Sequence, residues 1–458
     1  MSPPPAKPDL LTGADAAELV RVLSALGPDT LGLLRRSDTL LVGIRGMEVS
    51  SRRHRCAGTA LEILHSGRRR HMFSPECSAS ALHQLSQAAG ATGSTAGLGA
   101  ASPPADDLPD GVAAALFQLA EDVAERMLTG QHPALHPIIE VGAGLARIVV
   151  LRADAPVATD DRLHLELRIG ARIAGAPEGA RALRVVSGRS VELLSAGERH
   201  LAAADEVARV AVERSDATDP PEGDLPVVLA PGSPAALLHE VCGHGLEVDV
   251  ACAPAAAYHP PLGRRVGTPL VTVVDDPGMP SWAPLYRVDD EGWPAGRSVL
   301  IEHGVLAGYL TDGAGTRRTG HRRSGNGRRL DHTHPALARM SCTYLAAGES
   351  APEEALAGVR RGLYVKSIVA GETNMSGGEF AADVTESYLI ENGRITAPVR
   401  GATLHGTGTD VLRGIDVVCA DLDFLAFGFQ CNKLSQFPLT VSVGQPTVRV
   451  RELGVGAA

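Results

Sequence analysis

Aromatic side chains make up only 3% of this 458-residue chain, whereas glycines number 51 and prolines 31. With few large aromatic residues, the core has to rest on Val, Leu, Ile and Ala, and the many turn residues imply short elements. This composition argues against a bundle of long helices and favours a strand-rich or mixed fold. Because 44% of the residues are hydrophobic and 21% are charged, the sequence is globular, which excludes chain-wide disorder and fibrous repeats.

Signals for membranes and secretion are also missing. No run reaches the roughly 18 uncharged apolar residues that a membrane span needs, and the segment MSPPPAKPDL shows no basic stretch followed by an apolar one. We therefore expect a cytoplasmic protein with no membrane partner. The formal net charge is −10, so no nucleic-acid partner is expected either.

The seven cysteines contain no C-x-x-C pair. Their odd number and wide scatter argue against a disulfide framework and against a structural zinc ribbon. We expect most of them to be reduced, small core residues, and at least one to be a metal ligand.

Composition and periodicity divide the chain into two expected domains. Residues 1–14 are expected to be disordered, and residues 15–222 to form an α/β domain with a helix at 112–128 and a flexible loop near 90–111. The Asp- and Pro-rich segment around 215–224 indicates a linker. Residues 223–458 are short apolar runs separated by Gly, Asp and Asn, which predicts a β-rich domain. The expected fold class is therefore α+β.

Two short segments carry turn signals. Asn392-Gly393 lies between two apolar runs and predicts a tight hairpin turn. Residues 67–71 (GRRRH) indicate a surface turn between strands.

The most informative segment is residues 231–249, PGSPAALLHEVCGHGLEVD. Ser233 suits a helix N-cap and Pro234 the first helical position, so a short helix is expected to continue through the histidines. A zinc helix usually places its two histidines four residues apart, but here His244 follows His239 by five. On a regular helix that spacing separates the side chains by about 140°. A widened turn of the π type would bring both onto one face.

Glu240, next to the first histidine, completes a set of groups suited to hydrolysis. Two neutral imidazoles hold Zn²⁺ and leave a position for water, and the carboxylate takes the proton of that water as it attacks a carbonyl. The alternative is an ordinary helix with two unrelated histidines, and the unusual spacing alone leaves that interpretation open.

The segment 239–249 resembles the signature of the TldD/PmbA metalloprotease family, whose active subunit carries His-Glu-x-x-Gly-His-Gly-Leu-Glu. Further blocks match in the same order, so that the resemblance covers roughly residues 225–456, while the N-terminal half fits only in general layout. These blocks are 273–278, 289–292, 300–309, 325–329, 386–393 and 443–447. Because the metal motif is retained, the chain resembles the active, TldD-like subunit.

The resemblance implies a β-rich catalytic domain carrying a short metal-binding helix, with one metal bound by His239, His244 and a cysteine near the C-terminus. The family's cysteine lies in Cys-Gly-Lys-x-Gly-Gln, and residues 431–436 (CNKLSQ) keep its Cys, Lys and Gln but replace both glycines. Cys431 is therefore the implied third ligand, while Glu247 is either an alternative ligand or a partner that orients an imidazole. Zn²⁺ is the expected ion, although the same ligands also suit Fe²⁺ or Mn²⁺.

A third set of candidate residues lies in the block 325–329. Asn326, Arg328 and Arg329 are candidates for substrate binding, because two guanidinium groups suit a peptide carboxylate or backbone carbonyls. Gly-Asn-Gly is, however, also a simple turn sequence.

The resemblance implies a metallopeptidase that hydrolyses amide bonds in unfolded peptides or small peptidyl compounds, with Glu240 as the base. It also implies pairing with a metal-free paralogous subunit of the TldE/PmbA type, or with a second copy. Two alternatives stay open. One is a hydrolase that tailors a single peptide-derived metabolite, and the other is a non-enzymatic regulator or scaffold of the gyrase-modulator type.

Overall fold

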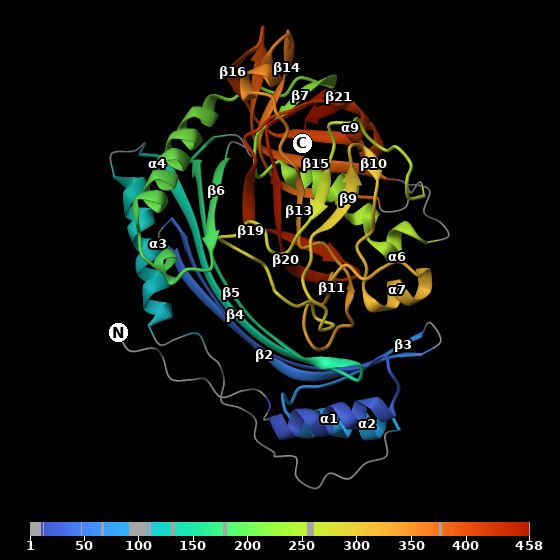
Figure 1. Ribbon diagram of the computed structural model, residues 1–458. Coiled ribbons are helices and arrows are strands. Elements are labelled where there is room, and N and C mark those ends of the chain that lie inside the picture. Colours follow the sequence, from blue (N-terminus) through green and yellow to red (C-terminus); the bar gives the residue numbers. More distant parts are fainter. Residues whose placement is uncertain are drawn as a thin grey trace.

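The computed structural model describes residues 11–457 apart from 12, 47, 66–67, 91–107, 109–110, 130–132, 177–180, 254–260 and 375–377. The predicted disordered segment 1–14 and flexible loop near 90–111 lie largely outside these residues, although the first helix already begins at Gly13. The fold is α+β, as the sequence predicts (Figure 1). Among the described residues, no helix has both the length and the apolar character needed to cross a membrane.

The N-terminal half is built on one curved antiparallel sheet with the strand order β3-β2-β1-β4-β5-β6. Burial alternates along parts of these strands, as at 38–45 of β1 and 135–141 of β4, while other parts are buried on successive residues because both faces of the sheet are covered. They are β1 (Thr30–Arg45), β2 (Glu48–His65), β3 (Arg68–Ser74), β4 (Leu135–Arg152), β5 (Ala155–Ile173) and β6 (Arg181–Gly188).

Helices cover one face of this sheet. In Figure 1 the sheet separates them from the C-terminal half, which rests against its other face. The helix predicted at 112–128 is present with the same bounds, and its buried residues, such as Leu116, Leu119 and Val123, recur every three to four positions. The helices are α1 (Gly13–Ala25), α2 (Ala79–Ala88), α3 (Val112–Leu128) and α4 (Glu198–Glu213), with short 3₁₀ turns at Val191–Leu194 and Arg214–Asp216.

Among the described residues, the C-terminal half contains two large sheets and the separate two-stranded pair β11–β12. In the first, with the order β10-β9-β8-β13-β20-β19, strand β19 forms one edge. In the second, β14, β7, β21, β17 and β15 close into a ring because β15 also pairs with β14, and β16 and β18 attach to its outside. The strands are β7 (Gly223–Leu229), β8 (Val273–Asp275), β9 (Ser298–Glu302), β10 (Val305–Leu306), β11 (Gly327–Arg328), β12 (Leu337–Ala338), β13 (Cys342–Leu345), β14 (Arg361–Thr373), β15 (Glu379–Glu391), β16 (Arg394–Val399), β17 (Ala402–Thr407), β18 (Ile415–Val418), β19 (Asp423–Lys433), β20 (Gln436–Gln445) and β21 (Val448–Ala457).

A short helical segment, residues 235–246, packs between these two sheets, against β14 on one side and β13 and β20 on the other. Its apolar residues belong to the largest core cluster of the described chain, which also includes Val227, Val365 and Val443 from the surrounding strands. The segment begins with α5 (Ala235–Leu238), and the other helices of this half are α6 (Val248–Ala251), α7 (Gly313–Thr319), α8 (Pro352–Leu356) and α9 (Gly408–Gly414).

One of the two turn predictions is confirmed. Asn392 and Gly393 join β15 to β16 and both have positive φ, 50° and 76°, as the tight hairpin requires. The other prediction is wrong for residues 68–71, which belong to strand β3, while residue 67 lies outside the described residues. The Arg69 side chain is mostly buried and bonds Asp312 at 2.7 Å, so this part of the segment contacts the C-terminal half.

Candidate metal centre

His239 begins a π-helical turn, His239–Gly243, that follows α5 directly, and His244 comes immediately after that turn. The backbone N–H of His244 donates to the carbonyl of His239, five residues earlier, which is the widened turn that the spacing predicts. Gly243 lets Met340 pack closely against the turn, because a Cβ on it would lie 2.0 Å from Sδ of Met340. The turn therefore brings both imidazoles to one side of the segment.

The predicted helix N-cap is wrong in its details. Pro234 occupies the cap position, and no side chain caps the helix. The Ser233 hydroxyl instead donates to the carbonyl of Ile368 at 3.1 Å and lies 3.3 Å from the hydroxyl of Ser367. Ser233 thus ties the start of the metal-site helix to β14.

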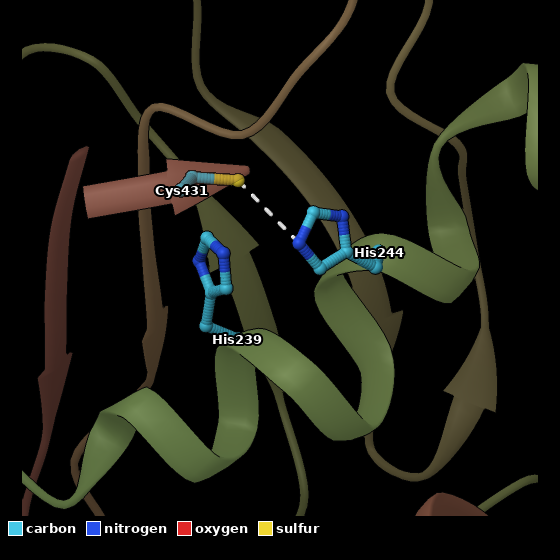
Figure 2. Close-up of side chains that lie close together, drawn as sticks. All are labelled: His239, His244 and Cys431. Atoms are coloured by element: carbon cyan, nitrogen blue, oxygen red, sulfur yellow. Dashed lines mark hydrogen bonds between the residues drawn. The ribbon is translucent and has the colours of Figure 1, made fainter. Parts of the chain in front are cut away.

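His239, His244 and Cys431 form one compact group (Figure 2). Their candidate ligand atoms all lie within 4.8 Å of one another, and Cys431 Sγ is 3.4 Å from Nε2 of His244. The two imidazoles meet edge to face with ring centroids 4.9 Å apart, and Phe429 of β19 packs against His239 at 5.0 Å. All three side chains are buried, and the described residues hold no second group of this kind.

The donor set fits a divalent metal. Both ring nitrogens of His239 are buried, and neither has a hydrogen-bond partner within the described chain. A buried imidazole without partners is costly, whereas two imidazoles and one thiolate form a common set of zinc ligands. Binding of a cation would therefore satisfy these side chains better than the contacts that they make with one another.

The charges within the group support the same interpretation. Burial would raise the pKa of the Cys431 thiol, but the imidazoles of His244 and His239 hold that pKa well below its usual range. Burial would lower the pKa of His244, but the Cys431 thiolate and the Glu247 carboxylate raise it well above its usual value. The protein thus stabilises the thiolate, which is the form of cysteine that binds metals.

Glu247 lies behind His244, on the side away from Cys431, and is not part of the group. Its Oε2 accepts a hydrogen bond from Nδ1 of His244 at 3.1 Å, and Lys433 Nζ lies 2.8 Å from the same oxygen. Although burial acts in the opposite direction, Lys433 and His244 lower the pKa of Glu247 to about 2. Of the two roles that the sequence leaves open for Glu247, this geometry is that of an imidazole partner.

Glu240 sits on the π turn beside the group and is 7% exposed. Burial raises the pKa of its carboxyl, while the two motif imidazoles act in the opposite direction. A Cβ on Gly371 of β14 would lie 2.8 Å from Cγ of Glu240, so the strand passes directly against this side chain. The carboxyl is therefore held in place by packing.

The three candidate substrate-binding residues are committed to internal contacts. Asn326 donates to Asp275 at 2.8 Å, Arg328 donates to the carbonyl of Thr440 at 2.8 Å, and Arg329 pairs with Glu62 at 2.7 Å. All three are buried. The structure gives them a role in holding the fold, and direct contact with a substrate stays a prediction.

Sequence reasoning missed two residues beside the group. Lys433 is part of the matched Cys-x-Lys motif, and it lies two positions after Cys431, with exposed Asn432 between them, so both face the same side of β19. The two-residue spacing from Cys431 could have indicated that Lys433 lies beside the metal group. The sequence gives no such signal for Gly371, because this residue comes close to Glu240 only when β14 packs against the π turn.

Comparison with known proteins gives a consistent result. The family described as PmbA/TldA metallopeptidase C-terminal domain matches residues 222–457. The metalloprotease TldD homolog of Haemophilus influenzae is 35% identical over 331 residues, covering 70% of this chain and 68% of that protein. The zinc metalloprotease TldD homolog of Saccharolobus solfataricus is 32% identical over 238 residues, covering 52% of each.

A third relative, the metalloprotease TldD homolog of Buchnera aphidicola subsp. Schizaphis graminum, is 34% identical over 251 residues. The match covers 55% of this chain and 52% of that relative, so the chain spans about half of the relative's length. Among solved structures, TldE from Thermococcus kodakarensis superposes with a TM-score of 0.72 over 97% of this chain and 100% of that one. A putative modulator of a DNA gyrase from Thermotoga maritima gives 0.72 over 97% and 99%. With identities of 16% and 17%, these two show a shared fold.

Proposed function

The chain belongs to the PmbA/TldD metallopeptidase family and is thus a metal-dependent hydrolase, and we propose that it cleaves amide bonds in unfolded peptides or small peptidyl compounds. The observation that carries this proposal is the buried group of His239, His244 and Cys431, with Glu240 on the same π turn. A scaffold has no evident use for the Glu240 carboxylate or for a donor set of two imidazoles and one thiolate, whereas hydrolysis uses each of them.

In the proposed mechanism, His239, His244 and Cys431 would hold one divalent cation, with Zn²⁺ as the expected ion. When bound, such a cation supplies Lewis acidity that polarises the scissile carbonyl and lowers the pKa of water. Glu240 accepts the proton of the attacking water and returns it to the leaving amine. Packing against Gly371 restricts the Glu240 carboxylate to one position beside the two imidazoles.

The proposed substrate is an extended chain. The C-terminal half is rich in strands, and a peptide would bind there by adding to one of its sheet edges as a further strand. Backbone hydrogen bonds of an added strand give affinity with little dependence on side chains. This mode favours unfolded peptides over folded proteins.

We further propose that the active form, in the cytoplasm, pairs with a metal-free paralogue of the TldE type or with a second copy. A solved structure of that fold is named TldE, and this chain covers all of it. A cavity closed by a partner would exclude water and align an extended substrate.

The test compares the purified chain with the reconstituted pair on two variants of one substrate protein, one folded and one destabilised. Metal content is measured on the same samples. We expect one metal per chain, cleavage of the destabilised variant only, and full activity only in the pair. A metal-free protein without hydrolysis would support the scaffold alternative. Cleavage of a single small conjugate, with none of random unfolded peptides, would support the tailoring alternative.

A further inference from the structure

Lysine is rare in this chain. Only three of its 43 basic residues are lysines, namely Lys7, Lys366 and Lys433. Two of them lie in the described part of the structure, and each bridges two carboxylates. Lys433 is nevertheless unusual, because its side chain is almost completely buried and lies next to the metal group.

The ammonium group of Lys433 is fully bonded. Nζ lies 2.8 Å from Oε2 of Glu247, 2.7 Å from Oδ1 of Asp249 and 2.9 Å from the carbonyl of Ala338. Three acceptors match the three N–H groups of a compact point charge, an arrangement that the planar fork of an arginine does not reproduce.

The contacts of Glu247 transmit this arrangement to His244. Besides Lys433, the carboxylate accepts from Nδ1 of His244 at 3.1 Å and from the backbone N–H of Met340 at 3.3 Å. Because an ionised carboxylate only accepts hydrogen bonds, Nδ1 has to carry the hydrogen. In the neutral form that binds a metal, the ring then carries its lone pair on Nε2, the atom that faces Cys431 Sγ at 3.4 Å.

His239 provides the contrast within the same site. Its ring is held only by its packing against His244 and Phe429, and neither of its nitrogens has a hydrogen-bond partner in the described residues. The polar contacts that orient a ligand ring are therefore concentrated on His244.

We propose that Lys433 is a positioning residue of the metal centre. It holds the Glu247 carboxylate in the place where that group accepts the Nδ1 hydrogen of His244 and leaves Nε2 available to the metal. Strand β19 thus carries the thiolate ligand Cys431 and, two residues later, Lys433, whose ammonium group orients His244 through Glu247. This inference rests on the proposed metal-binding function of the His239, His244 and Cys431 group.

The experiment is a double-mutant cycle on the full chain with Zn²⁺ alone as the probe. Zn²⁺ affinity is measured by chelator competition for the wild type, Lys433→Met, Glu247→Gln and the double variant, and the melting temperature of each metal-free protein is recorded. We expect Lys433→Met to weaken Zn²⁺ binding about 10- to 100-fold, the usual cost of losing a residue behind a ligand. We expect no further loss when Lys433→Met is added to Glu247→Gln, because Lys433 acts through that carboxylate.

A second readout separates positioning from general stability. The absorption spectrum of the Co²⁺-loaded protein reports ligand geometry, and we expect it to change in Lys433→Met. Lys366→Met is the matched control, because Lys366 also bridges two carboxylates, Glu206 at 2.8 Å and Glu386 at 3.6 Å, without contacting the metal group. It should keep both the Zn²⁺ affinity and the spectrum of the wild type.

Two results would overturn the inference while leaving the proposed function intact. One is a folded Lys433→Met protein with wild-type Zn²⁺ affinity, and the other is an equal loss in the presence and absence of Glu247. If the wild type binds no Zn²⁺, or if His239→Ala does not reduce the Zn²⁺ that it binds, both the proposed metal-binding function and the positioning role of Lys433 fail. Should Lys433→Met not fold, Lys433→Arg replaces it in the cycle, because it keeps the positive charge while its planar fork does not reproduce the three contacts of Nζ.

Discussion

Two buried regions of this molecule hold charged side chains in different ways. Around the π turn, an apolar core surrounds a small group of ligand-type residues in which His239 has no hydrogen-bond partner among the described residues. Where the N-terminal sheet meets the C-terminal half, buried arginines pair directly with carboxylates, as in Arg329–Glu62 at 2.7 Å and Arg162–Asp290 at 2.8 Å. In the first region both ring nitrogens of a candidate ligand lack a partner, whereas in the second each of these charges faces an opposite charge.

The difference shows that two segments resembling family blocks can be held by different kinds of contact. Residues 239–249 and 325–329 both match family blocks. The first block carries two of the candidate ligands, and the second joins the halves of the protein through Arg329. A buried pair such as this one contributes mainly when it is intact, because removal of one partner leaves an unpaired charge.

The largest effect is expected from Glu240→Gln. The amide keeps the shape of the side chain but cannot take a proton, so hydrolysis should fall by at least about 10²-fold. Metal content and melting temperature should stay near wild type, since Glu240 is not one of the grouped ligand atoms. Peptide turnover by metal-loaded protein is the measurement, and unchanged turnover would remove Glu240 from the mechanism.

Cys431→Ser tests the other half of the metal group. Loss of a thiolate ligand should weaken Zn²⁺ binding on the order of 10²-fold, since each ligand carries a share of the binding free energy. Cys419→Ala is the matched control, because Cys419 is equally buried but packs in a separate apolar cluster with Val228 and Ile390. Chelator competition measures both variants, and equal retention of metal would direct the search for a third ligand elsewhere.

Arg329→Met addresses the contact between the halves. It removes the closest cation from the buried Glu62, which keeps only His71 at 3.2 Å and Arg69 at 3.7 Å, so the free energy of unfolding should fall by about 3 kcal/mol. The folded fraction should still bind metal, because Arg329 contacts none of the three ligands. Thermal melting and metal analysis of the same sample check both parts. If Arg329→Met lost metal without losing stability, the two regions would not be separate.

Gly371→Ala should have the smallest effect. Its new Cβ would lie 2.8 Å from Cγ of Glu240 and push the carboxylate aside, so we expect kcat to fall about 10-fold with metal content unchanged. Gly296→Ala is the control, because the nearest atom to its new Cβ is 4.0 Å away, at Ser324. Similar kinetics for both variants would show that the position of Glu240 does not depend on β14.

Much of the metal group could be predicted because its information is local. The five-residue spacing of His239 and His244, with Gly243 and Gly245 beside the second histidine, predicts the π turn that the structure contains. The third candidate ligand, Cys431, could be predicted because the residues that follow it, up to 436, resemble a family motif. The helix at 112–128 and the hairpin at Asn392-Gly393 are likewise encoded by nearby residues.

The remaining features depend on partners distant in the sequence. Arg329 meets Glu62 across 267 positions, and Arg69 meets Asp312 across 243, so neither burial could be read from local composition. For the same reason the sequence left two roles open for Glu247. Its contact with Lys433 forms only when β19 and the π turn come together.

The order in which the ring of five strands is made has a consequence for biosynthesis. Strand β21 lies between β7 and β17 in that ring, yet it follows every other strand of the ring along the chain. During translation, β14 and β15 emerge before β21, the strand that connects β7 to β17 in the ring. The ring therefore cannot close until residues 448–457 have left the ribosome. Both histidines precede these residues by far along the chain, whereas Cys431 comes shortly before them, so the three candidate ligands can come together only when the ring is nearly complete.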